Sequence, residues 1–248
     1  TLCSNLVGTH NDVAAVSEIA KQVGALVIAD GVSYAPHTIP DLPAMGIDFY
    51  AYSTYKTFGP HQGVLWGSAE ALKKVEGQSH WFNEENARAR LNPTGPQHAQ
   101  VAALAGITEY FDALHQHHFG TRTGTLHDRA KAVFQLVAQH EAALANILLD
   151  FLKDKPDIRL LGQAYAEPGK RASTIAFHAR AMPSAVIAER LAAHGIGVGS
   201  GDFYARRCVE VLGMDPEDGV VRVSMVHYNT EAEVNRLVAA LDEILAAG

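Results

Sequence analysis

The sequence predicts an α/β fold, in which a mostly parallel sheet covered by helices is followed by a smaller α+β domain. Two observations lead to this fold class. The opening part alternates between helix and strand patterns, which is typical of a parallel sheet. A long helix pattern over about 125–154 then separates it from a second mixture of strands and helices. We therefore predict one domain at 1–122 and another at 123–248.

The first helix is predicted at 11–23. Its apolar residues recur at helical spacing, and Asn11 or Asp12 can cap its start while Gly24 can end it. These apolar residues are Val13, Val16, Ile19, Ala20 and Val23. The run ALVIAD at 25–30 then predicts a strand buried on both faces, because its apolar residues follow one another without alternation.

The later elements follow from the same patterns. Three prolines make 31–46 a loop. The strands are predicted at 48–53, 63–68, 157–162, 173–179, 196–199 and 220–228. The helices are predicted at 69–76, 98–118, 184–194, 203–212 and 230–247, with an irregular polar segment at 77–97 between the first two.

Composition and charge narrow the function classes. The 248 residues include 48% hydrophobic ones and carry a formal charge of −7 with a pI of about 6.0. Nothing in this balance favours binding to nucleic acid or to an anionic membrane. No apolar run reaches the roughly 20 residues of a membrane span, and no leader pattern opens the chain. Cys3 and Cys208 form no disulfide framework and suit a reducing compartment, so a cytoplasmic protein is expected.

The thirteen histidines raise the question of a metal site. The densest group, HQHH at 115–118, has neither acidic nor cysteine partners at a known ligand spacing. A solvated helix end is the favoured interpretation, and no metal site is predicted.

An acid and an amine stand at the ends of two predicted strands. Asp30 ends the first of them, and Ser53 and Lys56 end the second. Because ligands of parallel sheets bind at the carboxyl ends of the strands, the two groups can share one crevice. Pyridoxal phosphate (PLP) needs such a pair, an amine for a Schiff base and an acid for its ring nitrogen. Alternatively, Lys56 is a strand-end lysine that reaches water and Asp30 is an ordinary turn residue.

The longer string IADGVSYAPH…DFYAYSTYKTFGPHQGVLW resembles the class V PLP-dependent enzymes, the aminotransferase and cysteine desulfurase family of fold type I. Three further segments are similar to the family: SNLVG at 4–8, NPTGPQH at 92–98 and VVRVSMVHYNTEAEVNRLVAAL at 220–241. The resemblance covers nearly the whole chain. It implies that 1–122 is the C-terminal part of a large PLP-binding domain with helices on both faces of its sheet, and that 123–248 is the small α+β domain.

The resemblance implies a role for each matching side chain. Lys56 would hold PLP through a Schiff base, and Asp30 would pair with the ring nitrogen. Asn5 would approach the ring hydroxyl. Arg222 would bind the α-carboxylate of an amino acid substrate, a task that suits a planar two-donor fork. The alternative for Arg222 is an arginine on the surface of a strand.

Polar contacts to the phosphate and the ring oxygen are also implied. Ser53 would bind the phosphate, and Thr94 would reach the phosphate of a neighbouring subunit, so a homodimer is expected. Ser33 and Tyr55 stand where the desulfurase branch has Gln and His. Their hydroxyls can supply rearranged hydrogen bonds to the ring oxygen and the phosphate.

The loop GSGDFYARRC at 199–208 departs from the desulfurases. Tyr204 stands where one desulfurase group has its persulfide-forming cysteine, and a phenol cannot attack the substrate sulfur. Cys208, one helical turn further on, is interpreted as a small buried residue. We therefore expect a class V aminotransferase-like enzyme that acts on an amino acid through Lys56. A cysteine desulfurase, using Cys208 or no protein thiol, and a folded but catalytically silent chain remain as alternatives.

The chain opens on TLCSN, without an initiator Met. The family carries a phosphate-binding turn and a ring-stacking aromatic residue before the SNLVG segment, and neither has a counterpart in 1–5. The sequence is therefore expected to be the C-terminal portion of a longer protein and to bind PLP weakly, or not at all, on its own.

Overall fold

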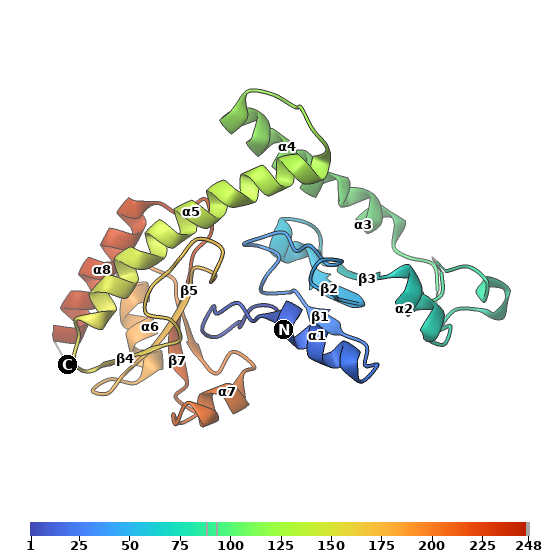
Figure 1. Ribbon diagram of the computed structural model, residues 1–248. Coiled ribbons are helices and arrows are strands. Elements are labelled where there is room, and N and C mark those ends of the chain that lie inside the picture. Colours follow the sequence, from blue (N-terminus) through green and yellow to red (C-terminus); the bar gives the residue numbers. More distant parts are fainter. Residues whose placement is uncertain (88, 93, 247–248) are drawn as a thin grey trace. The chain divides into compact units, whose positions relative to one another are not determined.

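The computed structural model describes residues 1–87, 89–92 and 94–246. The chain forms two compact units. The first unit consists of Thr1–Leu2 and Asn11–Phe134, and the second consists of Cys3–His10 and the chain from Gln135 onward. Figure 1 shows the helices and strands coloured along the sequence, from blue at the N-terminus to red at the C-terminus.

The first unit contains a three-stranded sheet in the order β1-β2-β3. Its strands are β1 (Ile28–Asp30), β2 (Phe49–Ser53) and β3 (Gly63–Gly67). Strands β1 and β2 run parallel, while β3 turns back antiparallel to β2. Helix α1 (Val13–Gln22) precedes the sheet, and the Asp12 side chain caps it by accepting a hydrogen bond from Ala15 N–H at 3.0 Å.

The prediction that 25–30 is buried on both faces is wrong. Only Ile28–Asp30 forms a strand, and its burial alternates. Val27 and Ala29 pack into a core cluster with Val13 of α1 and Tyr50 of β2, whereas Ile28 on the other face is 72% exposed. The alternation arises because the described part of the first unit packs side chains against one face of β1 and leaves the Ile28 side open.

The turn η1 (Thr54–Thr57) lies between β2 and β3. The elements between β3 and the long helix are α2 (Ala69–Lys74), η2 (Trp81–Asn83), α3 (His98–Ala103) and α4 (Ala105–Phe119). The helix predicted at 98–118 is therefore divided into α3 and α4 at Leu104. An ion pair joins α4 to the next helix, because Arg129 donates to both carboxylate oxygens of Asp112, at 2.7 and 2.9 Å.

Helix α5 (Leu126–Lys153) confirms the long helix predicted at about 125–154. The two compact units divide within it, after Phe134, twelve residues beyond the predicted boundary at 122/123. The assignment of the two segments to a cofactor-binding domain and a C-terminal domain stays a prediction. By length and composition α5 could cross a membrane, but half of its most apolar stretch is buried in the protein. Core packing of residues such as Leu148 and Leu149 explains this hydropathy.

The second unit contains a four-stranded antiparallel sheet in the order β4-β5-β7-β6. A core cluster of fully buried residues such as Phe177, Leu148 and Leu241 joins the sheet to its helices. The strands are β4 (Ile158–Leu161), β5 (Thr174–Ala179), β6 (Gly199–Gly201) and β7 (Val220–Ser224). The helices are α6 (Ser184–Ala193), α7 (Arg206–Val211) and α8 (Glu231–Ala246).

The helix predicted at 203–212 begins later than expected. Helix α7 starts at Arg206, because Phe203 and Tyr204 have φ angles of 52° and 61°. These positive values belong to the left-handed region and cannot continue into a right-handed helix. The strand predicted at 220–228 is also shorter, since β7 ends at Ser224.

Candidate active site

Asp30 and the turn that carries Lys56 lie at the same end of the sheet, where the parallel strands β1 and β2 have their carboxyl ends. Asp30 is the last residue of β1 and pairs in parallel register with Ala51 of β2. Ser53, two residues further along β2, lies on the same face as Ala51 because side chains alternate along a strand. The exposed Asp30 side chain accepts a hydrogen bond from Val32 N–H at 2.9 Å, which shapes the turn that follows β1.

Lys56 is partly buried in η1, the turn that follows β2 directly. The buried residue Thr54 fixes this turn, because its N–H donates to Gln62 O at 2.8 Å and its hydroxyl donates to Pro60 O at 2.6 Å. Phe58 ends the turn in a left-handed conformation with φ 67°. The sequence GP after the turn therefore returns the chain to β3 and holds Lys56 at the end of the parallel pair.

Three further predicted residues follow the same two strands. Ser33 lies in the turn after β1 and is partly buried, and Ser53 is partly buried at the end of β2. Tyr55 is 46% exposed, and its ring stacks on His61 with a centroid separation of 4.7 Å. All three thus belong to the end of the sheet that carries Asp30 and Lys56, and their contacts with a cofactor stay predictions.

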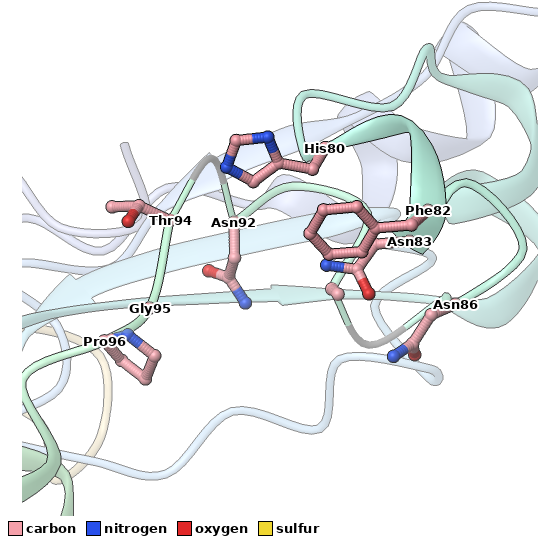
Figure 2. Close-up of a pocket in the computed structure, with 9 residues that line it drawn as sticks. His80, Phe82, Asn83, Asn86, Asn92, Thr94, Gly95 and Pro96 are labelled. Carbon is pink, nitrogen blue, oxygen red and sulfur yellow. The ribbon is translucent and has the colours of Figure 1, made fainter.

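Thr94 belongs to a different pocket of the first unit. It lines a pocket of about 380 Å³, and none of the other predicted site residues lines it. Figure 2 shows Thr94 on a loop, with His80, Phe82 and Asn92 among the side chains that line the same pocket. His80 and Phe82 stack with ring centroids 5.1 Å apart. In the segment 92–98, residue 93 lies outside the described residues, and the role of Thr94 toward a neighbouring subunit stays a prediction.

Asn5 and Arg222 meet in the second unit. Nη1 of Arg222, on β7, donates to the main-chain oxygen of Asn5 at 2.9 Å. The Asn5 side chain donates to the main-chain oxygen of Phe203 at 2.7 Å, and the Arg222 guanidinium carbon lies 3.9 Å from the centre of the Phe203 ring. These three residues form one contact group.

Within the part of the chain that the structure describes, no carboxylate forms an ion pair with Arg222. Its Nε–H is buried without a hydrogen-bond partner among the same residues. Burial lowers the pKa of this guanidinium from its ordinary value, although arginine still keeps its proton at neutral pH. A partly buried cation with unfilled donor capacity is suited to binding an anion.

Sequence reasoning missed two residues that shape this group. Phe203 supports Arg222, but no sequence pattern marked its left-handed backbone. Arg171, only 5% exposed, donates to the main-chain oxygens of Val7 and Thr174 at 3.2 and 2.8 Å. Arg171 thereby fastens the segment that carries Asn5 to β5. Burial is the cause that lowers the pKa of Arg171.

Tyr204 lies in the loop before α7, and Cys208 lies within α7. The Tyr204 side chain is fully exposed, and its N–H donates to the Asp202 carboxylate at 3.0 Å. Cys208 is partly buried and packs against a core cluster that includes Val209 and Val220. The described part of the chain holds no group of three His, Cys, Asp or Glu side chains placed to bind a metal.

Curated proteins are similar to this chain over nearly its whole length. The aminotransferase-like protein FGM3 of Gibberella zeae is 34% identical, over 99% of this chain and 58% of its own length. The cysteine desulfurase-like protein ustD of Aspergillus flavus is 30% identical, over 98% of this chain and 53% of its own length. The chain thus spans little more than half the length of these curated relatives.

Solved structures show the same fold. The cysteine desulfurase CsdA of Escherichia coli matches with a TM-score of 0.77 at 26% identity, over 99% of this chain and 58% of its own. The cysteine desulfurase of Thermococcus onnurineus matches with a TM-score of 0.78 at 21% identity, over 99% of this chain and 59% of its own. The predicted α/β fold of type I is confirmed. The family model described as aminotransferase class-V matches residues 1–237, and this chain belongs to that family.

Proposed function

We propose that the chain provides the cofactor lysine and the substrate carboxylate site of a PLP-dependent, class V aminotransferase-like enzyme that acts on an amino acid. The observation that carries the proposal is the parallel pairing of β1 and β2, which brings Asp30 and the Lys56 turn to one edge of the sheet. Ligands of parallel sheets bind at that edge.

The side chains at this edge fit the chemistry of PLP. An aldehyde needs an amine, a pyridine nitrogen needs an acid, and a phosphate needs hydroxyl and N–H donors. Lys56 supplies the amine and Asp30 the acid, while Ser53 and Ser33 offer hydroxyls near the ends of the same strands. When bound, PLP supplies an electron sink for the carbanion formed at the substrate α-carbon.

Each residue has a defined task in this proposal. Nζ of Lys56 would hold the cofactor covalently and would give way to the amine of the substrate. The uncharged Nζ would then accept the α-proton of the substrate and hold it for delivery to the product. The Asp30 carboxylate would hold the ring nitrogen and favour its protonated form.

Arg222 is proposed to bind the α-carboxylate of the substrate. It carries a desolvated charge without a carboxylate partner in the described residues, and a substrate carboxylate would supply the missing counter-charge. The attraction within such a pair is stronger away from water, and hydrogen bonds between the two partners offset part of the cost of desolvating them. Arg222 would thus recognise the carboxylate of the substrate and not its side chain.

A cysteine desulfurase is the second candidate function, because several relatives bear that description. The probable cysteine desulfurase of Pseudomonas putida, for example, is 31% identical over 97% of this chain. Against it, the exposed side chain on the 202–205 loop is the phenol of Tyr204, and Cys208 packs into a core cluster. Incubation with L-cysteine and a thiol reductant tests for a desulfurase, which yields alanine and, by way of the reductant, sulfide. An aminotransferase yields no alanine from cysteine in this way, and it yields the corresponding oxo acid from a suitable amino acid when an amino acceptor is supplied.

A homodimer in the cytoplasm completes the proposal. The homodimer rests on the family resemblance of the segment that carries Thr94, and the compartment rests on cysteine usage. Light scattering of the purified protein gives its mass in solution, and a monomer across the micromolar range would contradict the dimer.

The cofactor part of the proposal is tested by visible absorbance. We expect the complete protein to show the absorbance band of lysine-bound PLP, and Lys56→Ala to lose it. The matched control is Lys73→Ala, since Lys73 is an exposed residue of α2 and should keep the band. A catalytically silent chain would show no change of the band with any amino acid, and a band that survives in Lys56→Ala would contradict the proposal.

A further inference from the structure

Two groups that carry no negative charge hold the Arg222 guanidinium. Nη1 donates to Asn5 O at 2.9 Å, Nε is buried, and the Phe203 ring lies under the guanidinium carbon at 3.9 Å. No hydrogen bond joins Nη2 to another residue in the described part of the chain. A guanidinium has five N–H donors, so most of those at its Nη end are unused.

We propose that Phe203 is a positioning residue for Arg222, which holds the guanidinium so that its Nη end, and not its Nε edge, receives a carboxylate. The proposal deepens the function proposed above, since it rests on Arg222 as the carboxylate site. An aromatic ring suits this task because it attracts the cation through its face and uses none of the in-plane N–H donors.

The space for the Phe203 ring depends on a glycine in the neighbouring strand. Gly199 of β6 is the register partner of Arg222 on β7. A Cβ atom added to Gly199 would come within 2.7 Å of Phe203 Cε1, which is closer than real Cβ contacts. The missing side chain at Gly199 therefore leaves the slot that the ring fills beside Arg222.

The backbone of the loop aims the ring into that slot. Phe203 and Tyr204 are consecutive non-glycine residues in the left-handed region, a conformation that they adopt only when their surroundings impose it. Two hydrogen bonds hold them there, from the Asn5 side chain to Phe203 O at 2.7 Å and from Tyr204 N–H to the Asp202 carboxylate at 3.0 Å. Asn5 thus contacts both Phe203 and Arg222, and it links the ring to the cation.

Simple packing is the competing explanation for Phe203, since the ring also contacts the core cluster around Val209 and Val220. The two explanations make different predictions for aromatic and aliphatic replacements. A packing residue tolerates any side chain of similar size, whereas a ring that orients a cation requires another aromatic ring.

The test uses the complete chain, labelled with ¹⁵N at arginine, and acetate as the carboxylate probe. The Arg222 signals are assigned by comparison with Arg222→Lys. We expect acetate to shift the Nη signals of Arg222 more than its Nε signal, and acetamide, the neutral analogue, to shift neither. We expect Phe203→Leu to weaken acetate binding about fivefold, and Phe203→Tyr to retain it.

A second variant guards against misfolding of Phe203→Leu. Gly199→Ala keeps the phenylalanine at position 203 but places a methyl group where its ring lies. The ring is then displaced from Arg222, so this variant should weaken acetate binding by a similar factor. An acetate shift centred on Nε, no acetate binding by the parent chain, or equal binding by the parent chain, Phe203→Leu and Gly199→Ala would overturn the proposal. The titration involves neither Lys56 nor PLP, so its failure is distinct from a failure of the absorbance test above.

Discussion

Nη1 of Arg222 donates a hydrogen bond of 2.9 Å to the main-chain oxygen of Asn5, across 217 positions of the sequence. With the hydrogen bonds from Arg171 to Val7 O and from Ala172 N–H to Gly8 O, this contact ties Cys3–His10 to the second compact unit, although the segment precedes the first helix. Asn5, predicted to approach the ring hydroxyl, and Arg222, predicted to bind the substrate carboxylate, are thus in contact within one unit. The strand β7 and the SNLVG segment form a single local structure.

Replacement of Arg222 by Lys is predicted to raise KM for the amino acid substrate at least tenfold, with a smaller effect on kcat. Lysine keeps the charge but loses the planar fork and the contact with Asn5 O. Steady-state kinetics of the complete enzyme measure both constants. Arg207→Lys is the matched control, because Arg207 is exposed on α7 and should leave KM unchanged. Equal KM values in both variants would exclude Arg222 from the carboxylate site.

Replacement of Arg171 by Met is predicted to lower the free energy of unfolding by about 3 kcal/mol, since it leaves buried main-chain oxygens without their donor. The oxygens concerned include those of Val7, Ala172 and Thr174, at 3.2, 3.2 and 2.8 Å. Urea unfolding followed by circular dichroism measures the change. The exposed Arg159 provides the control, and Arg159→Met should change stability by less than about 0.5 kcal/mol.

A comparison of two glycines separates backbone strain from steric contact. Gly8 and Gly169 have similar φ angles of 71° and 76°. A Cβ at Gly8 would come within 2.4 Å of Thr174 O, whereas a Cβ at Gly169 would meet nothing within 4 Å. We predict that Gly169→Ala costs about 1 kcal/mol of stability from strain alone, and that Gly8→Ala costs clearly more. If urea unfolding showed similar losses of stability in the two variants, the close approach of Thr174 O to Gly8 would not contribute to the cost of the Gly8 substitution.

The ion pair between Asp112 and Arg129 predicts a loss of stability in acid. The hydrogen bond from Arg129 is the main cause that lowers the pKa of the Asp112 carboxyl in the folded chain. Because the folded pKa is depressed, the stabilisation is present above the unfolded value of about 3.9 and is lost as the pH falls through the folded value. We therefore expect Asp112→Asn to reduce the drop in stability between about pH 6 and about pH 3.

Urea unfolding at the two pH values checks this expectation. Asp150→Asn is a suitable control, since Asp150 pairs with Lys153 within one helix and is largely exposed. A drop of the same size in the parent chain and in Asp112→Asn would show that this ion pair does not contribute to acid sensitivity.

Local sequence patterns predicted the elements that carry the proposed cofactor site. The strands at 48–53 and 63–68 and the helix at about 125–154 all follow from periodicity and turn residues, and the structure places them within a few positions of the prediction. Such features depend on neighbouring residues along the chain, so a single sequence contains the necessary information.

Features that depend on distant contacts escaped prediction. The exposure of Ile28 is set by which elements pack on its face of the sheet, and the run ALVIAD contains no trace of this. The left-handed backbone at Phe203 and Tyr204 depends on the Asn5 side chain and on the empty position at Gly199. Likewise, the role of Arg171 becomes visible only when the segment Cys3–His10 lies against β5.

The central claim, that Lys56 is the residue bonded to PLP, is tested most directly by reduction with borohydride. Reduction makes the link between cofactor and lysine permanent, and mass spectrometry of a digest then locates it. We predict that the phosphopyridoxyl group lies on the peptide that contains Lys56. Its presence on another lysine, such as Lys73 or Lys170, with an unmodified Lys56 would contradict the account.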